Sequence, residues 1–266
     1  MQFDSISVEG LSHRFLSRNR SPTVALSDVS IQFPAGKVTS IVGPSGCGKS
    51  TLLLIMRGLV EATDGKVRFL YGNGSGTAIS GAPPRMATVW QSFNLLPWRT
   101  VIDNVAFGLE LQGMATEERR ERALSAIKAV ELGGFEQHYP GQLSGGMKQR
   151  VGLARGIVMS PDILFLDEPF GALDAQTRLY LQEQLSELVE RSAKTVILIT
   201  HSIEEAIFLG DRVMVMTARP GRVAATLDID LPRPRSFDVQ KQKAFGELFS
   251  EIYGLLRDEV RKSMLS

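Results

Sequence analysis

The 266-residue chain carries 30 lysines and arginines against 29 aspartates and glutamates, a net charge of +1, and 43% of its residues are hydrophobic. This length and composition predict a globular protein of one large domain or two small ones. The near-zero net charge excludes a whole-chain electrostatic attraction to nucleic acid or to an anionic membrane. A single cysteine, Cys47, excludes an internal disulfide and is typical of a protein from a reducing cytosol.

Neither a membrane span nor a targeting signal is predicted. The longest apolar runs, such as residues 52–56 and 195–200, fall far short of the roughly 20 residues that cross a bilayer. Residues 1–10 have neither the basic nor the apolar region of a signal peptide, so we expect none.

The first third of the chain predicts a strand hairpin that leads into a glycine loop. Residues 28–33 and 38–43 have strand patterns, and the turn sequence PAGK separates them. A helix follows at residues 52–56 (LLLIM), which is apolar nearly all round and therefore expected to be buried. The glycine-rich connector at 71–84 predicts a loop.

Between about residues 93 and 158 the pattern predicts helices. Residues 116–132 carry acids in their first turn and apolar residues at helical spacing, with Thr116 as the N-cap. A second helix, residues 147–159, follows the sequence LSGG and has one apolar side. This region indicates a helical insert in an α/β protein.

The remainder alternates apolar strands with helices. Residues 162–169, 195–200 and 212–216 are continuous apolar runs of the kind that form strands covered on both faces. Asp174 is placed to cap one intervening helix, and Ser202 opens the next with a capping-box spacing. The alternation predicts a mostly parallel sheet. From about residue 231 a proline-rich stretch precedes a last amphipathic helix.

The sequence GPSGCGKST matches the phosphate-binding loop pattern G-x-x-x-x-G-K-[ST] between a predicted strand and a predicted helix. Glycines let backbone N–H groups surround the phosphates, Lys49 places charge on the β and γ oxygens, and the Ser50 hydroxyl ligates Mg²⁺. Cys47 is expected to be a small spacer rather than a catalytic thiol. The expected nucleotide contacts are Gly43, Pro44, Ser45, Gly46, Cys47, Gly48, Lys49, Ser50 and Thr51.

Two strand ends carry further chemistry. Asp167 ends an apolar strand at the sheet edge where α/β proteins bind ligands, which predicts a role toward Mg²⁺. Glu168 follows, and a glutamate beside a metal-binding aspartate can deprotonate water; a solvated strand end is the alternative. His201 ends another strand, where a γ-phosphate contact is favoured over a structural role. His13 and His138 have no chemical neighbours in sequence and are predicted to be surface or loop residues.

The sequence LSGGMKQR predicts a second anion site. Ser144, Gly145 and Gly146 precede a predicted helix, and they offer a hydroxyl and backbone N–H donors at its positive dipole end. A chain with one complete phosphate loop has no evident use for this second site on its own nucleotide.

Six motifs in this order resemble the nucleotide-binding subunit of an ATP-binding cassette (ABC) transporter: GPSGCGKST, Gln91 in VWQSFN, LSGGM, ILFLDEP, GALD and ITH. The resemblance extends from about residue 5 to about residue 230. More narrowly, NLLPWRTVIDNVAFGLEL, DEPFGALDAQTR and LPRPR are similar to the importer ATPases of the nitrate, sulfonate and taurine group. The departures are Trp90, Met147 and the long connector at 71–84.

The resemblance implies an α/β fold: a P-loop NTPase core with a mostly parallel central sheet, an antiparallel β subdomain and a helical insert. The core and its antiparallel subdomain are expected at residues 1–92 and 159–230. The helical signature subdomain is expected at 93–158, and a C-terminal helical tail at 231–266.

The resemblance also implies roles for single residues. Gln91 would contact the metal and the attacking water, and Phe15 would stack on adenine unless it is a strand-end core residue. Asp174 would communicate between two subunits, a role compatible with capping a helix. The remaining assignments match the residue chemistry above: Lys49, Ser50 and Thr51 to phosphate and Mg²⁺, Asp167 to Mg²⁺, Glu168 as general base, and His201 to the γ-phosphate.

In this family two cassettes pair head to tail around two ATP molecules. The LSGGM motif, called the signature, of one cassette closes the site of the other. The resemblance therefore implies ATP and Mg²⁺ as cofactors and a homodimer or paired cassette. It further implies two transmembrane permease subunits, an indirect solute-binding protein, no nucleic acid, and a peripheral location on the cytoplasmic face of the inner membrane. Residues 93–98 are apolar enough to receive a permease helix, although Trp98 could instead pack inside the helical insert.

The predicted function is ATP hydrolysis that drives uptake of a small anionic solute of the nitrate, sulfonate or taurine type. One alternative is a soluble ABC ATPase that acts on DNA or ribosomes, but such proteins usually carry tandem cassettes or a long coiled-coil insertion. The other is a nucleotide-gated scaffold with little turnover, against which Glu168 argues because a scaffold needs no general base.

Overall fold

The computed structural model describes residues 3–17, 20–72, 84–171, 173–192 and 194–265. The chain forms two compact units. The first comprises Met1–Pro84 and Ala193–Ser266, and the second comprises Arg85–Ser192. The predicted loop at 71–84 falls almost entirely outside the described residues. Within the described part of the chain, no helix combines the length and apolar character needed to cross a membrane.

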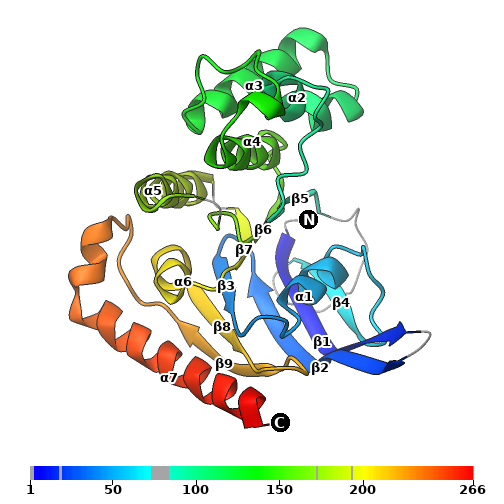
Figure 1. The fold of residues 1–266 in the computed structure, drawn as a ribbon, viewed down its shortest axis with the longest axis vertical. Helices are drawn as coiled ribbons and strands as arrows, with labels where there is room; N and C mark the ends of the chain where they lie inside the picture. Colours follow the sequence, from blue (N-terminus) through cyan, green and yellow to red (C-terminus); the bar gives the residue numbers. More distant parts are fainter. Residues whose placement is uncertain (1–2, 18–19, 73–83, 172, 193, 266) are drawn as a thin grey trace. The chain divides into compact units, whose positions relative to one another are not determined.

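The first unit contains an antiparallel sheet, drawn in blue and cyan in Figure 1. Its strand order is β2-β1-β4. Register pairs such as Ile6 with Phe33, and Val8 with both Ile31 and Val67, place apolar side chains opposite one another, and Ile6, Val8 and Phe33 are buried. This sheet is the predicted antiparallel subdomain. The strands are β1 (Phe3–Ser17), β2 (Arg20–Pro34) and β4 (Asp64–Tyr71).

The first unit also contributes strands that are mostly parallel. β3 lies between β7 and β8 and runs parallel to both, while β9 pairs antiparallel with β8. Every residue of β3 and β7 is buried, as the continuous apolar runs predict for strands covered on both faces. The strands are β3 (Val38–Val42), β7 (Thr195–Ile199), β8 (Arg212–Met216) and β9 (Val223–Asp228).

The predicted hairpin of residues 28–33 and 38–43 is wrong, because β2 and β3 belong to different sheets. The backbone N–H of Ala35 donates to the Asp4 carbonyl at 2.7 Å, which continues the antiparallel sheet. The next N–H, of Gly36, donates to Thr195 Oγ1 at 3.0 Å, beside β7. Gly36 has a φ of 69°, which lets the chain turn from one sheet to the other within two residues.

Helices complete the first unit. The predicted break near residue 231 and the last helix are both present, with the short helix η2 between them. Buried Arg235 holds this irregular stretch against the rest of the unit, because its guanidinium donates to the carbonyls of Ile207, Gly210 and Ile229 at 2.6 to 3.2 Å. The helices are α1 (Lys49–Met56), α6 (Ile203–Leu209), η2 (Phe237–Lys241) and α7 (Lys243–Leu265).

The capping box predicted at Ser202 is modified by a neighbouring hydroxyl. Ser202 Oγ accepts from the Glu205 N–H at 3.1 Å, as predicted. The Glu205 carboxylate accepts from Thr200 Oγ1 at 2.9 Å, and the Ser202 N–H donates to that same oxygen at 3.1 Å. Thr200, which directly follows β7, therefore connects Glu205 to the Ser202 backbone within this cap.

The second unit joins a parallel strand pair to a group of helices, drawn in green in Figure 1. Thr116 is the first residue of α3 and Ala115 takes the N-cap place, so the predicted cap is wrong by one residue; Ala115 has the extended backbone of a cap but no side-chain acceptor. The elements are β5 (Met86–Val89), α2 (Val101–Leu111), α3 (Thr116–Ala129), η1 (Pro140–Gln142), α4 (Gly145–Val158), β6 (Ile163–Asp167) and α5 (Ala175–Ser192).

Candidate nucleotide site

The glycine loop lies between β3 and α1 in the first unit, as the sequence predicts. Gly46 and Gly48 have φ values of 72° and 105°, which L side chains rarely adopt. A Cβ on Gly48 would lie 2.7 Å from Leu26 Cδ2 and 2.9 Å from the Ala25 carbonyl oxygen. Both the backbone conformation and the contact with β2 therefore require glycine at position 48.

Lys49 is buried and its ammonium lies against the loop itself. The Nζ donates to the carbonyls of Gly43 at 2.8 Å and Pro44 at 3.0 Å. Ser50 and Thr51 continue into the first turn of α1, and Ser50 is exposed. The loop thus combines a lysine cation with the N–H groups of a helix N-terminus, which is an arrangement that binds phosphate.

Cys47 is buried beneath the loop, with its Sγ 3.8 Å from Lys49 Nζ. Burial raises the pKa of the Cys47 thiol, and the nearby Lys49 opposes that rise only in part. A thiol with a raised pKa stays protonated near neutral pH and is a poor nucleophile. The spacer role predicted for Cys47 fits this environment.

His201 lies at the same sheet edge as the glycine loop. It follows β7, whose partner β3 runs parallel to it and ends at the loop. The carboxyl ends of parallel neighbours meet at one edge, so this geometry brings an exposed imidazole to the side of the sheet that carries Lys49.

Phe15 lies on β1 and is 47% exposed, which contradicts the alternative that it is a core residue. Its ring meets the His13 ring edge to face, with centroids 4.6 Å apart. His13 is only 8% exposed, so the prediction of a surface or loop position is wrong. The long strand β1 continues through this stretch and places His13 opposite Leu26. His138 lies in a loop, as predicted.

The second unit carries the two carboxylates. Asp167 is the last residue of β6 and is buried. The Glu168 side chain accepts a hydrogen bond from Gln91 Nε2 at 2.8 Å. Gln91 follows β5, the parallel neighbour of β6, so two strand ends bring these residues together.

Gln149 is a residue of this region that the sequence prediction missed. It is buried on α4, and its Nε2 donates to the Glu168 carbonyl at 3.3 Å. The Gly171 N–H donates to the same carbonyl, also at 3.3 Å. These bonds hold the backbone of Glu168, whose φ of 49° is unusual for a residue with a side chain. The available signal was the helical spacing of Gln149 with the buried Leu153.

The signature residues form an exposed helix N-terminus. Ser144 caps α4, with its Oγ accepting from the Met147 N–H at 3.2 Å. The first turn contains no acid, and a Cβ on Gly145 would meet nothing within 4 Å. Gly146 is more restricted, because a Cβ there would lie 3.0 Å from Leu173 Cδ2. The helix therefore presents N–H donors and a positive dipole end to an open surface.

Asp174 caps α5, as predicted. Its Oδ1 accepts from the Thr177 N–H at 3.0 Å, and this hydrogen bond lowers the pKa of the exposed Asp174 carboxyl. The hydrogen bond therefore favours the ionised carboxylate. Asp174 directly follows Leu173, whose Cδ2 lies next to Gly146 of the signature.

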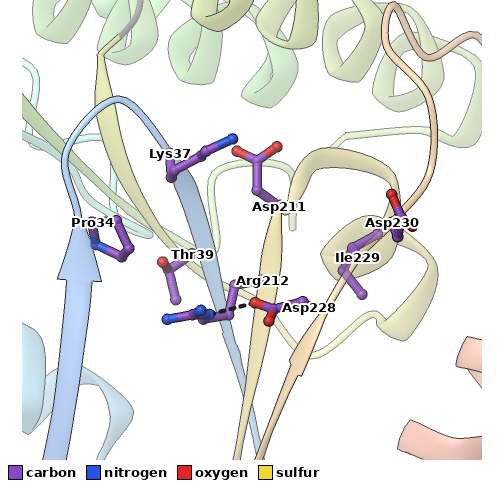
Figure 2. Close-up of a pocket in the computed structure, with 8 residues that line it drawn as sticks. All are labelled: Pro34, Lys37, Thr39, Asp211, Arg212, Asp228, Ile229 and Asp230. Carbon is purple, nitrogen blue, oxygen red and sulfur yellow. Dashed lines mark hydrogen bonds and ion pairs between the residues drawn. The ribbon is translucent and has the colours of Figure 1, made fainter.

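A separate pocket of about 450 Å³ lies at the opposite, amino ends of β3 and β8 (Figure 2). Its charged groups are largely paired. Arg212 Nε donates to Asp228 at 2.8 Å, and the Asp211 carboxylate accepts from the Val38 N–H and from Arg233 Nε. The position excludes this pocket as the phosphate site. Its lining residues are Pro34, Lys37, Thr39, Asp211, Arg212, Asp228, Ile229 and Asp230.

A family model described as ABC transporter matches residues 26–171. The chain belongs to the ABC transporter family. Over 97% of its length it is 45% identical to an uncharacterized ABC transporter ATP-binding protein of Methanocaldococcus jannaschii, of which it covers 94%. It is 43% identical to a taurine import ATP-binding protein of Rhizobium johnstonii, with 94% of this chain and 96% of that protein covered.

Two further comparisons also match ABC transporter proteins. A bicarbonate transport ATP-binding protein of Synechococcus elongatus is 38% identical over 98% of this chain and 39% of its own length. A solved dimeric bacterial ABC transporter cassette has a TM-score of 0.74 and 32% identity, with 85% of this ABC chain and 100% of that chain covered. The same cassette has also been solved bound to ADP and Pi. The predicted family and P-loop α/β fold are confirmed, and the chain is an ABC ATPase.

Proposed function

We propose that this ABC ATPase powers an importer for a small anionic solute of the nitrate, sulfonate or taurine type. Relatives named for taurine import and for bicarbonate transport support the proposal. The observation that carries it is that each unit has an incomplete anion-binding part of its own, the glycine loop in the first unit and the exposed signature helix in the second. We expect each ATP to need both parts, from two different cassettes.

In this proposal the glycine loop holds the ATP phosphates. Lys49 would exchange its bonds to the Gly43 and Pro44 carbonyls for bonds to the β and γ oxygens. Phosphate oxygens carry more charge than peptide carbonyls, so this exchange favours binding. His201 contacts the γ-phosphate from the end of β7, and the exposed ring of Phe15 stacks on adenine.

Glu168 is proposed as the general base. Its hydrogen bond from Gln91 orients the carboxylate, and the bonds from Gln149 and Gly171 fix its backbone. A carboxylate held in this way can accept a proton from water as the water attacks the γ-phosphate. The rate enhancement then depends on positioning and on cations that stabilise the developing charge.

We propose Ser50, Asp167 and Gln91 as ligands of Mg²⁺, because each offers a side-chain oxygen. Gln91 gives its amide N–H to Glu168, which leaves its oxygen as a ligand, and Mg²⁺ prefers oxygen ligands. Among the residues that the structure describes, no three His, Cys, Asp or Glu side chains form a metal-binding group, so the phosphates would supply further ligands. When bound, Mg²⁺ would neutralise charge on the β and γ oxygens.

We further propose that residues 93–98 receive a helix of a permease subunit. The carbonyls of Phe93 and Asn94 accept from Arg155 at 3.0 and 2.7 Å. Buried Asn104 bonds the backbone of Leu96 in both directions, at 2.8 and 3.1 Å. On this fixed loop Trp98 is 71% exposed, which contradicts its packing inside the helical insert and suits a partner surface.

This function places the chain on the cytoplasmic face of the inner membrane as a dimer or paired cassette, with two permease subunits and, indirectly, a solute-binding protein. The domain boundaries predicted at residues 93, 159 and 231 remain part of the proposal. An ABC ATPase that acts away from membranes would have no need of an exposed tryptophan on a rigid loop. A scaffold without turnover would have no need of a held carboxylate at Glu168.

The test is solute uptake by a reconstituted complex. The chain is co-expressed with the permease and solute-binding proteins encoded beside it, and the complex is placed in proteoliposomes with internal Mg²⁺-ATP. We expect ATP-dependent accumulation of labelled taurine, another sulfonate, nitrate or bicarbonate, and none with Glu168→Gln. Failure of the permease to co-purify with the chain, or ATPase activity of the complex without uptake of any of these solutes, would contradict the proposal.

A further inference from the structure

The segment Thr217–Arg222, which joins β8 to β9, folds into a closed turn beside the glycine loop. The Thr217 N–H donates to the Arg222 carbonyl at 3.0 Å, and the Arg222 N–H returns a bond to Thr217 Oγ1 at 2.9 Å. Thr217 Oγ1 also donates to the Pro220 carbonyl at 3.0 Å. We call this segment the brace. All of it lies in the same unit as the glycine loop.

Arg219 joins the brace to the glycine loop. Its Nε and Nη2 both donate to the Gly46 carbonyl oxygen, at 3.2 and 3.0 Å. A trans peptide points its carbonyl and the following N–H in opposite directions. Arg219 therefore holds the carbonyl side of the peptide that joins Gly46 to Cys47. The N–H on the other side of this peptide belongs to Cys47 and donates to the Pro44 carbonyl of the same loop at 3.3 Å.

Gly221 supports the next residue of the glycine loop. A Cβ on Gly221 would lie only 2.0 Å from the Cys47 carbonyl oxygen, so the two backbones are in close contact. The Gly221 N–H donates to the Ala25 carbonyl at 2.9 Å, and its carbonyl accepts from the Ser27 N–H at 3.0 Å. β2 thus holds the brace in place against the loop.

The C-terminal helix α7 reaches the brace through one carboxylate. Glu259 is only 8% exposed, and its Oε2 accepts from the Ala218 N–H at 3.2 Å. Ala218 directly precedes Arg219. A continuous set of hydrogen bonds therefore runs from α7 through the brace to Gly46. Ala218, Arg219 and Glu259 belong to none of the motifs that identify the ABC family in the sequence.

We propose that Arg219 is a positioning residue for the phosphate-binding loop, and that Glu259 makes this positioning depend on α7. The inference rests on the proposed nucleotide site. Gly46 has a left-handed backbone and no side chain, so without an external bond it has wide conformational freedom. A loop already held in its binding conformation loses less entropy when ATP binds. The brace should therefore tighten nucleotide binding more than it speeds the chemical step.

The first test compares Arg219→Ala and Arg219→Lys in the full-length chain. A fluorescent ATP analogue gives Kd, and steady-state ATPase assays give KM and kcat. Because the lost hydrogen bonds involve a charged donor, we expect Arg219→Ala to raise Kd and KM about 10-fold, with kcat changed less than about 3-fold. Lysine cannot reproduce the fork of two donors, so Arg219→Lys should recover only part of the affinity.

Arg222→Ala is the matched control, since Arg222 contributes only its backbone to the brace. It should leave Kd unchanged. Thermal unfolding of each variant shows whether the chain still folds. An equal loss of affinity in Arg222→Ala and Arg219→Ala would overturn the proposal, as would a fall in kcat at unchanged Kd.

The second test separates the contribution of α7. Glu259→Gln keeps an oxygen acceptor for the Ala218 N–H and should bind the analogue nearly as the wild type does. Glu259→Ala removes the acceptor and should raise Kd about 3- to 10-fold. Glu251→Ala, an exposed position of the same helix, is its control. The Arg219→Ala, Glu259→Ala double variant should bind no more weakly than Arg219→Ala alone, because both act through one contact.

Two failures can be told apart. If the wild-type chain does not bind the analogue with Mg²⁺, the proposed nucleotide site is wrong. If the wild type binds and Lys49→Ala does not, but Arg219→Ala binds like the wild type, the nucleotide site stands and the role of the brace is refuted. Additive effects of Arg219→Ala and Glu259→Ala would refute the connection to α7.

Discussion

The glycine loop and the signature helix are both proposed to bind anions at a helix N-terminus, but they are built in opposite ways. The glycine loop is supported from behind by β2 and by the brace, and its lysine is already bonded to the loop's own carbonyls. The signature presents exposed Ser144 and Gly145, and one cap bond is formed there, from Met147 to Ser144.

The difference separates a site that can hold a ligand alone from one that needs a second molecule. In the proposed site the loop would surround phosphate with donors, and Lys49 would exchange its bonds to the loop carbonyls for bonds to phosphate. The signature offers donors on an open surface, where water competes for them. It becomes a strong anion site only when another surface excludes that water. The comparison therefore supports the proposal that the two parts act on one ATP across a pair of cassettes.

The sharpest test of the comparison is Glu168→Gln. The amide cannot accept the proton from water, so ATP turnover should fall about 10²- to 10⁴-fold. Binding through the glycine loop should persist, and ATP should then trap a dimer that light scattering detects on a sizing column. Unchanged turnover would show that Glu168 is not the base, and a trapped monomer would break the two-cassette interpretation.

Gly145→Asp tests the signature alone. A Cβ at this position meets no atom within 4 Å, so the change should not disturb folding, while its negative charge repels phosphate. We expect ATPase activity to fall about 10²-fold, with analogue binding to the monomer unchanged. Gly145→Ala is the uncharged control and should retain much more activity. Equal losses of analogue binding and turnover would mean that the signature contacts the chain's own nucleotide.

Trp98→Glu should affect transport and leave the nucleotide sites intact. We expect the ATPase activity of the isolated chain to be unchanged and solute uptake by the reconstituted complex to fall about 10-fold or more, because buried tryptophans dominate many interfaces. Leu111→Glu, an exposed apolar position on α2, is the control. Parallel loss of ATPase activity and uptake would point to a packing role for Trp98.

The smallest effect is expected from Asp174→Ala, which removes the cap of α5. The Thr177 hydrogen bond lowers the pKa of Asp174, so the folded state favours the ionised carboxyl. This stabilisation is present above the ordinary pKa of 3.8 and is lost as the pH falls through the lower folded value. The variant should melt a few degrees below the wild type at pH 7, and the gap should close at strongly acidic pH. A gap independent of pH would exclude the charged cap.

What could be predicted from the sequence was chiefly local. A strand, a glycine loop and a helix follow one another as predicted and form the proposed phosphate site. Asp174 and Ser202 cap their helices because an N-cap bonds residues only three positions away. The hairpin failed because the true partners of β3 lie far along the chain. The N-cap predicted at Thr116 was wrong by one residue, which is within the usual uncertainty of helix boundaries.

The residues that sequence analysis missed share a physical reason. Gln149 and Arg219 both donate to backbone carbonyls, of Glu168 and Gly46. Every residue has a carbonyl, so such an acceptor leaves no signature in the sequence. Gln91 and Glu168, by contrast, meet side chain to side chain, and the resemblance to a known family marked both positions.

The switch of sheets at Ala35 and Gly36 has a consequence for the order of folding. Val38 pairs with Val196, so the central strand beneath the phosphate loop has its partner on a segment that the ribosome makes much later. The intervening Arg85–Ser192 is one continuous stretch with its own compact contacts, and it can begin to fold during synthesis. Because long-range pairing is slow, the nucleotide loop, although synthesised early, gains its support only when most of the chain has emerged.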